Sequence, residues 1–235
     1  MRDRSAIAGV AIGAARIALL CVAFGATAPS RAQPLPPAPP GGSTAPTATA
    51  KSAAAIDGFR SATFGMTETE VRAAIAEDFH LAPAAVRAGE NSVQRTTILS
   101  VHVADLVPGG GTAIVSYIFG YQSHRLIEVN IIWSKETDPA LTAARLATIG
   151  ATLQSYFAGE NFPPQSRAMS IPVRDGLLLF RATDTVGHAV VLILSGRTAK
   201  DQKTGKTSLT PTTLSVAYAA NAAHPDVFTL KKGSF

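Results

Sequence analysis

Hydrophobic and polar positions alternate with a period of two in six segments of the chain, which predicts six β-strands. The first three strands are residues 96–107, 113–121 and 126–133, and the last three are residues 177–183, 188–195 and 212–219. Successive side chains of a strand point to opposite faces of its sheet, so the alternation predicts one apolar face. Short turns join most consecutive strands, and we therefore expect an antiparallel meander within each group of three.

A helix is predicted to begin just after Thr67 and to end near Phe79. The Thr67 hydroxyl can accept a hydrogen bond from the Glu70 amide, and the Glu70 carboxylate can bind the Thr67 amide, which makes a capping box. The apolar stripe of this helix is Val71, Ala74 and Ile75. A second, shorter helix is predicted over residues 84–88.

The longest predicted helix precedes the second group of strands. Asp138 is expected to cap it, Pro139 occupies its first position, and Gly159 follows its end. Its apolar stripe is Leu146, Ile149, Leu153 and Tyr156 or Phe157. Residues 161–172 are expected to be an irregular crossing, and residues 196–210 a loop.

The order of these elements predicts an α+β fold. We expect one antiparallel sheet made of two three-stranded meanders, each preceded by a helix, with the helices packed on one face. Residues 55–222 would form a single domain, either undivided or as two α-βββ halves, 55–135 and 136–222. Residues 223–235 would form a loose C-terminal tail, unless Val227, Phe228 and Leu230 pin it as an extra strand.

The first 32 residues have the pattern of a secretory signal peptide. Arg2 and Arg4 charge its start, residues 17–28 form an apolar run, and small residues of the segment 30–32 define a cleavage site. The apolar run is shorter than the roughly 20 residues that span a bilayer. The alternative is an uncleaved anchor, which would place Arg16 within the membrane.

Residues 33–54 consist mainly of Pro, Ala, Gly, Ser and Thr, which predicts a disordered tether, either a spacer or a recognition segment. The protein is therefore expected to be periplasmic or secreted, without a transmembrane span after cleavage.

Charge and cysteine usage narrow the classes of function. The whole chain carries a formal net charge of +5, but outside the first 32 residues only 17 basic and 15 acidic residues remain. This small excess does not predict a nucleic-acid-binding surface. The single cysteine, Cys21, lies in the predicted signal peptide, so cleavage would leave no disulfide and no thiolate site.

Sequence motifs for catalysis are not apparent. The five histidines do not have the spacing of a metal site; they are His80, His102, His124, His188 and His224. The chain contains no G-x-S-x-G nucleophile motif, and the glycine-rich segment 108–112 precedes a strand, which predicts a hairpin turn rather than a phosphate loop. Asp105, Glu128 and Asp184 are the main acidic candidates, each interpreted as a turn or surface residue. We therefore expect no enzymatic activity, cofactor or metal.

Two groups of residues are candidates for binding. The loop at 196–210 carries four basic residues, Arg197, Lys200, Lys203 and Lys206, against one acidic residue, Asp201. It could bind an acidic partner or an anionic envelope component, or it could be a solvated loop. The aromatic residues Tyr117, Phe119, Tyr121 and Trp133 could form a binding patch, but the core is the favoured interpretation.

The segment Gly65-Met66-Thr67, followed by Val71, Ile75 and a meander, resembles the SmpA/OmlA (BamE-like) group of exported domains. The repeated order of helix and strands is similar to β-lactamase-inhibitor-like folds. The resemblance implies protein–protein binding in the envelope and no chemistry. The chain departs from the group because residues 78–81 replace its Leu-Gly-x-Pro segment and because the lipid attachment box is missing.

Three hypotheses about function follow. The first is a non-enzymatic exported protein that binds another protein or an envelope component. The second is a small-molecule binding module, with the ligand held between the sheet and the long helix. The third is a hydrolase whose site is assembled from residues distant in sequence.

Overall fold

The computed structural model describes residues 52–200, 202–205, 207–230 and 233–234. The predicted signal peptide and most of the predicted tether lie outside the described residues. The end of the predicted tether belongs to the folded domain, because the Ala54 amide donates a hydrogen bond to the Asn161 carbonyl at 3.0 Å.

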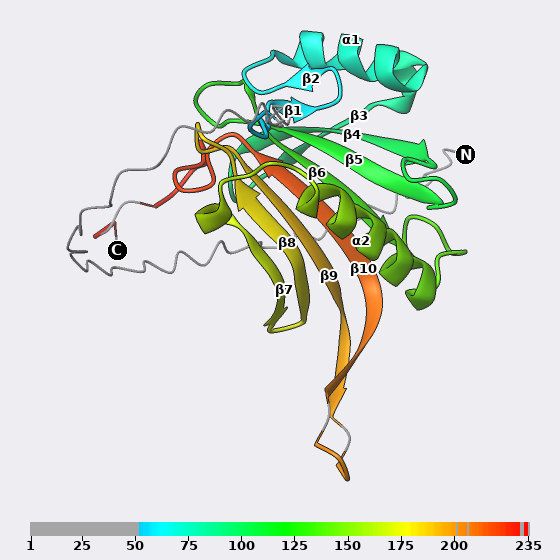
Figure 1. Ribbon diagram of the computed structural model, residues 1–235. Helices are drawn as coiled ribbons and strands as arrows, with labels where there is room; N and C mark the ends of the chain where they lie inside the picture. The colour runs from blue at the N-terminus through cyan, green and yellow to red at the C-terminus, as the bar shows by residue number, and fades with distance from the viewer. Residues whose placement is uncertain (1–51, 201, 206, 231–232, 235) are drawn as a thin grey trace, which may run out of the picture. The chain divides into compact units, whose positions relative to one another are not determined.

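The fold is α+β and is built around an eight-stranded antiparallel sheet (Figure 1). Its strands are β3 (Arg87–Asn91), β4 (Thr96–Ala104), β5 (Thr112–Phe119), β6 (Leu126–Ser134), β7 (Ala168–Val173), β8 (Gly176–Thr183), β9 (Ala189–Lys200) and β10 (Thr207–Ala219). The spatial order is β3-β4-β5-β6-β10-β9-β8-β7. The last strands of the two groups, β6 and β10, therefore pair at the centre.

In the described residues, two helices, two 3₁₀ turns and a small hairpin accompany the sheet. They are α1 (Glu68–Phe79), α2 (Ala143–Ala158), the turns Pro83–Ala85 and Pro164–Ser166, and the hairpin β1 (Gly58–Phe59) with β2 (Ala62–Thr63). The same order of elements occurs twice, since α1 precedes β3–β6 and α2 precedes β7–β10.

Each group of strands contains four members, so the prediction of two three-stranded meanders is wrong. The additional strands β3 and β7 form the two edges of the sheet. The helix predicted over residues 84–88 is also wrong, because a 3₁₀ turn there leads into β3. Both edge strands lack an apolar alternation: β3 has exposed residues at four of its five positions, and β7 contains Pro172.

The start of α1 agrees with the sequence. Thr67 accepts a hydrogen bond from the Glu70 amide at 3.3 Å, and the Glu70 carboxylate accepts one from the Thr67 amide at 2.7 Å, so the capping box is confirmed. Helix α2 begins later than predicted, because Thr142 is its N-cap. Asp138 instead accepts hydrogen bonds from the amides of Thr112 and Ala140, which holds the β5 end and the loop before α2 together.

One face of the sheet carries most of the buried side chains of the core. Its largest buried side chains include Leu99, Tyr117, Trp133, Phe180, Leu192 and Leu214. Helix α2 lies against β8, β9 and β10. Gly150 makes this close approach possible, since a Cβ atom there would lie 2.7 Å from a Leu179 methyl group. From α1, Val71, Ala74 and Ile75 belong to the same hydrophobic cluster.

The C-terminal segment docks against the turns of the first group of strands, which corrects the prediction of a loose tail. The Asp226 carboxylate accepts hydrogen bonds from the Gln122 and Ser123 amides. The Phe228 amide donates to the Gln94 carbonyl, and the guanidinium of Arg95 lies 4.0 Å from the centre of the Phe228 ring. The segment is thus held by polar and cation–π contacts rather than as an extra strand.

Removing the α1 cap should weaken the fold measurably. We expect Thr67→Ala to lower the free energy of unfolding by about 0.5–2 kcal/mol, because the Glu70 amide loses its acceptor, the Thr67 hydroxyl. Urea denaturation followed by circular dichroism measures the change. Thr69→Ala, at an exposed position of the same turn, is the matched control and should be neutral within about 0.5 kcal/mol. Equal losses in both variants would contradict the role of the cap.

Candidate functional site

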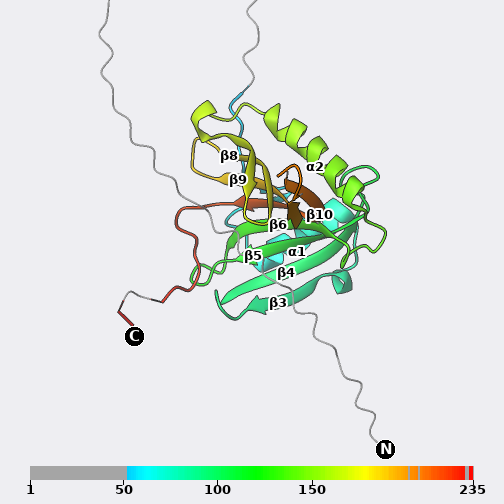
Figure 2. The ribbon, with the colours of Figure 1, turned by 90° about the horizontal axis from the view of Figure 1, so that it is seen from below.

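The second face of the sheet, here called the open face, carries half-buried side chains across its strands. Its aliphatic members are Ile98 on β4, Ile114 and Ile118 on β5, Ile132 on β6, Leu178 on β8 and Ile193 on β9. The strand registers place them on the side opposite the buried core face. Viewed from below, strands β3–β6 lie in front of α1 (Figure 2).

Polar side chains occupy the middle of the open face. The hydroxyls of Ser100 and Ser116 lie 3.0 Å apart on neighbouring strands. On the next strand, the Asn130 amide nitrogen donates to the Glu128 carboxylate at 2.7 Å. Burial raises the pKa of Glu128, against the opposing effect of this hydrogen bond. A carboxylate therefore sits where its charge is poorly solvated.

The open face also carries basic groups near its edges. Arg87 on β3 pairs in register with Ser100, and Arg181 on β8 pairs with Val191, so both side chains belong to this face. His102 is exposed on the same face of β4. Neither arginine makes an ion pair within the described part of the chain. The face thus combines aliphatic, uncharged polar and basic side chains with the carboxylate of Glu128.

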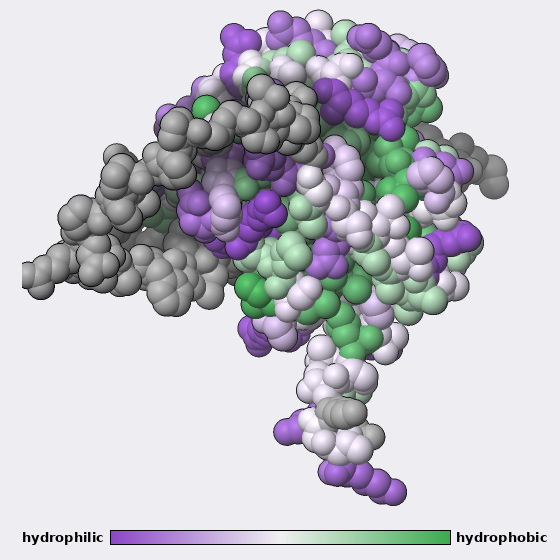
Figure 3. Space-filling view, viewed as in Figure 1, coloured by the Kyte–Doolittle hydropathy of each residue, from purple (hydrophilic) through white to green (hydrophobic). Residues whose placement is uncertain are grey.

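The predicted basic loop is a projecting β-hairpin, so its assignment as a loop is wrong. Strand β8 pairs with β9 only as far as Ser195, and β6 pairs with β10 only as far as Thr213, so the remaining residues of β9 and β10 pair with each other alone. Figure 1 shows this ribbon extending beyond the other strands, and Figure 3 shows few hydrophobic residues on it.

The hairpin does not gather its basic side chains on one side. Arg197 pairs with Thr210 and lies on the side of the open face, whereas Lys200 pairs with Thr207 and lies on the opposite side. Lys203 lies in the turn. Lys206, together with Asp201, lies outside the described residues. Of the predicted partner-binding residues, the structure therefore associates Arg197 alone with the open face.

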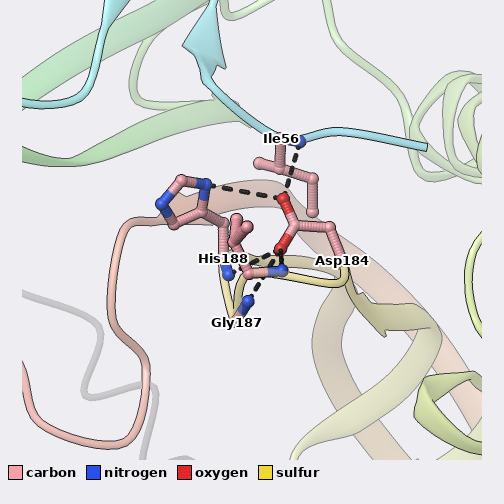
Figure 4. A network of polar contacts seen from close by, with 5 residues as sticks. Ile56, Asp184, Gly187 and His188 are labelled. Atoms are coloured by element: carbon pink, nitrogen blue, oxygen red, sulfur yellow. Dashed lines mark hydrogen bonds and ion pairs between the residues drawn. The ribbon is translucent and has the colours of Figure 1, made fainter. Parts of the chain in front are cut away.

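Asp184 links the β8–β9 turn to the N-terminal segment (Figure 4). One carboxylate oxygen accepts hydrogen bonds from the amides of Val186, Gly187 and His188, at 2.9–3.0 Å. The other oxygen accepts one from the Ile56 amide at 3.0 Å, across 128 residues of sequence. The Asp184 carboxylate therefore fixes both the turn and the chain that leads to β1.

The His188–Asp184 pair is the nearest approach to catalytic geometry. Its Nδ1 lies 3.4 Å from the second carboxylate oxygen of Asp184 but makes no hydrogen bond among the described residues. The ring packs edge-on against Phe64, with centroids 5.1 Å apart. Both carboxylate oxygens of Asp184 already accept hydrogen bonds from backbone amides. The structure of the turn therefore explains why the two side chains lie close together.

The segment held by Asp184 forms one wall of a cleft of about 440 Å³. The wall runs from Ala54 to Arg60, and the rest is formed by the C-terminal part of α2, by Glu160 and Phe162 after it, and by Tyr218 of β10. Five aromatic rings line this cleft: Phe59, Tyr156, Phe157, Phe162 and Tyr218. Burial, with a smaller effect of Tyr156, raises the pKa of Tyr218, whose hydroxyl stays neutral at physiological pH. The cleft lies at the end of α2 rather than between the sheet and the whole helix.

The other residues that the sequence suggested for a metal or binding site lie at a helix cap, in turns or in the core. His80 is the C-cap of α1, His124 lies in the β5–β6 turn, and the His224 amide binds Asn221. The described residues contain no group of three or more His, Cys, Asp or Glu side chains that could hold a metal ion. Tyr117, Phe119 and Trp133 are buried in the core, whereas Tyr121 contacts Phe228.

Asp105 accepts a hydrogen bond from Gly111, which confirms the hairpin turn after β4.

Neither helix of the described chain is long and apolar enough to cross a membrane. Comparison with protein-family models, with curated proteins and with solved structures found no match to this chain. The function is therefore inferred from the side chains of the open face and of the cleft.

The raised pKa of Glu128 predicts how the stability of the fold depends on pH. A carboxyl whose pKa is raised by folding retains its proton in the folded state while the unfolded chain loses it, so stability falls as pH rises through the folded pKa. Glu128→Gln should remove this loss and keep the hydrogen bond from Asn130. Urea denaturation between about pH 4 and 8 should show the variant gaining stability over the parent protein as pH rises. A stability difference between Glu128→Gln and the parent protein that does not change with pH would contradict this prediction.

Asp184 makes a second prediction. Asp184→Ala leaves several backbone amides without an acceptor and should lower the free energy of unfolding by about 2–4 kcal/mol. Amide hydrogen exchange should also become faster at Ile56, because the link to the N-terminal segment is lost. Asp175→Ala in the exposed β7–β8 turn is the control, with an expected effect within about 0.5 kcal/mol. Unchanged exchange at Ile56 in Asp184→Ala would refute the link.

Proposed function

We propose that this chain is an exported, non-enzymatic protein and that it binds another folded protein through the open face of its sheet. The observation that carries the proposal is the set of six half-buried aliphatic side chains that β4, β5, β6, β8 and β9 place on this face. Apolar side chains gathered on one surface are characteristic of binding sites. The signal-peptide pattern of the first 32 residues supports export.

The size of the open face supports a protein as the partner. Seven spacings between eight strands, at about 4.8 Å each, give a width of about 34 Å. Four rows of side chains along the strands span roughly 20 Å, so the projected area is roughly 700 Å². This is close to the roughly 800 Å² that each partner buries in a standard protein–protein interface.

The charges of the open face indicate the chemistry of the partner. Arg87 and Arg181 lie toward opposite edges, and Arg197 extends the basic side along the projecting hairpin. Glu128 lies between them, and its raised pKa reflects poor solvation. We therefore propose a partner that presents both apolar side chains and acidic side chains, the acidic ones lying opposite the basic edges of this face.

The proposal takes both helices to cover the other face of the sheet. Its support is that Val71 and Ile75 of α1 and Leu146 and Ile149 of α2 belong to one hydrophobic cluster with the buried sheet face. A sheet covered on one side in this way presents the other side to a partner.

Site-specific photo-cross-linking in the cells that produce the protein tests the proposal. A photoreactive residue at Arg87 or His102, both exposed on the open face, should give a discrete adduct with another protein. The same residue at Val93 or Val186, which are 72% and 73% exposed outside that face, should not. The adduct should be lost when Ile114→Asp and Ile193→Asp are added, and Arg181→Glu should weaken it.

Two controls separate the possible results. Val186→Asp adds the same charge elsewhere and should leave the adduct unchanged. Higher salt should reduce the yield, because exposed opposite charges are screened. An adduct with a second copy of this chain, equal adducts at all four positions, or none at the open face would overturn the proposal.

A further inference from the structure

Strand β7 carries the most exposed large aliphatic side chains of the open face. Ile171 and Val173 are 44% and 42% exposed. Ile171 pairs in register with Leu178 of β8, which in turn pairs with Ile193 of β9. Val173 pairs with Gly176, two positions before Leu178. Since alternate residues of a strand share one side, both side chains extend the open face to this edge of the sheet.

The backbone of β7 is not suited to accept a further strand, although β7 forms an edge of the sheet (Figure 1). Pro172 has no amide hydrogen to donate, and Ser170 has a φ of 55°, in the left-handed region. The pairing with β8 also skips Ser170. Proline and local irregularities in edge strands hinder the addition of another strand. A partner at this edge is therefore expected to pack against side chains rather than to extend the sheet.

The irregularity at Ser170 also divides the exposed apolar side chains of β7 between the two faces of the sheet. Met169 pairs with Phe180, whose side chain is buried in the core, so Met169 lies on the core side of the sheet. Met169 is 45% exposed, almost the same fraction as Ile171. One strand thus offers two apolar side chains of equal exposure, of which only Ile171 belongs to the open face.

Two arginines lie on either side of these aliphatic residues. Along β9, the open face carries Val191, Ile193, Ser195 and Arg197 in this order, and Arg181 of β8 pairs with Val191. At about 3.4 Å per residue, the two arginines leave the sheet roughly 20 Å apart, with Ile193 between them. Neither guanidinium forms an ion pair with another described residue. Both are therefore available to acidic side chains of a partner.

We propose that the partner of the open face is anchored at the β7 end. Apolar side chains of the partner pack on Ile171, Val173 and Leu178, and its carboxylates pair with Arg181 and Arg197. This inference rests on the proposed function and adds where on the open face the partner gains most of its affinity. Exposed aliphatic side chains have the most area to remove from water, and arginine contributes strongly to interfaces. At the other edge, β3 offers no large apolar side chain.

Two matched pairs of substitutions test the anchor in the full chain, in the cells that produce it, with the photoreactive residue at His102 as the probe. Ile171→Asp should reduce the adduct about tenfold or more, because it buries a charge among apolar side chains of the interface. Met169→Asp, equally exposed on the other side of the sheet, should leave the adduct unchanged. Arg197→Glu should reduce the adduct about threefold or more, because it repels the carboxylates of the partner. Lys200→Glu, on the opposite side of the hairpin, should leave it unchanged.

Circular dichroism of the purified variants establishes that each is folded like the parent protein. The pair at Arg197 and Lys200, both exposed on the projecting hairpin, keeps the test decisive if Ile171→Asp unfolds the chain. Equal adduct yields within either pair of folded variants would overturn the anchor at β7 and leave binding at the open face intact. Absence of any adduct from His102 in the parent protein would instead overturn the proposed function, and the anchor with it.

Discussion

The pairing of β6 with β10 is the interaction on which the rest of the structure depends. Seven residue pairs, from Thr213 with Ser134 to Ala219 with Glu128, join two groups of strands that follow one another along the chain. Trp133 and Leu214 face each other in this register, and both are fully buried. Without this pairing, each group would be a four-stranded sheet with two edges and an incomplete core. With it, the side chains of the open face extend across both groups of strands.

The sequence predicts the regular parts of this fold because local signals and burial agree there. The α1 cap depends on two residues three positions apart. In β4, β5 and β6, the apolar positions of the sequence pattern mostly lie on the buried side, and the positions between them are mostly half-buried. The edge strands could not be predicted in this way, since β3 buries none of its side chains and Pro172 argues against a strand. Asp138 has the residue type of a helix cap, but it binds Thr112, 26 residues earlier, and Thr142 takes its place.

The candidate sites were less accessible to sequence reasoning, for different reasons. The open face had a signal, because Ile114, Ile118 and Ile132 stand at the positions that an exposed face would fill with polar residues. The cleft had no local signal, since its rings come from three distant segments and its wall depends on Asp184, 128 residues from Ile56. The basic residues formed an obvious group in sequence, but strand pairing sends Arg197 and Lys200 to opposite sides of the hairpin.

The cleft and the open face lie on different sides of one strand, which determines how occupation of one can affect the other. Tyr218 belongs to the buried face and lines the cleft, whereas its neighbour Ala219 pairs with Glu128 on the open face. A ligand in the cleft and a partner on the open face therefore would not compete for the same space. Any coupling between them would have to pass through β10 or through the core. Because packed interiors resist small displacements, binding at one surface need not change the other. Independent binding is thus the simplest expectation, and a measured coupling would indicate that β10 has two arrangements.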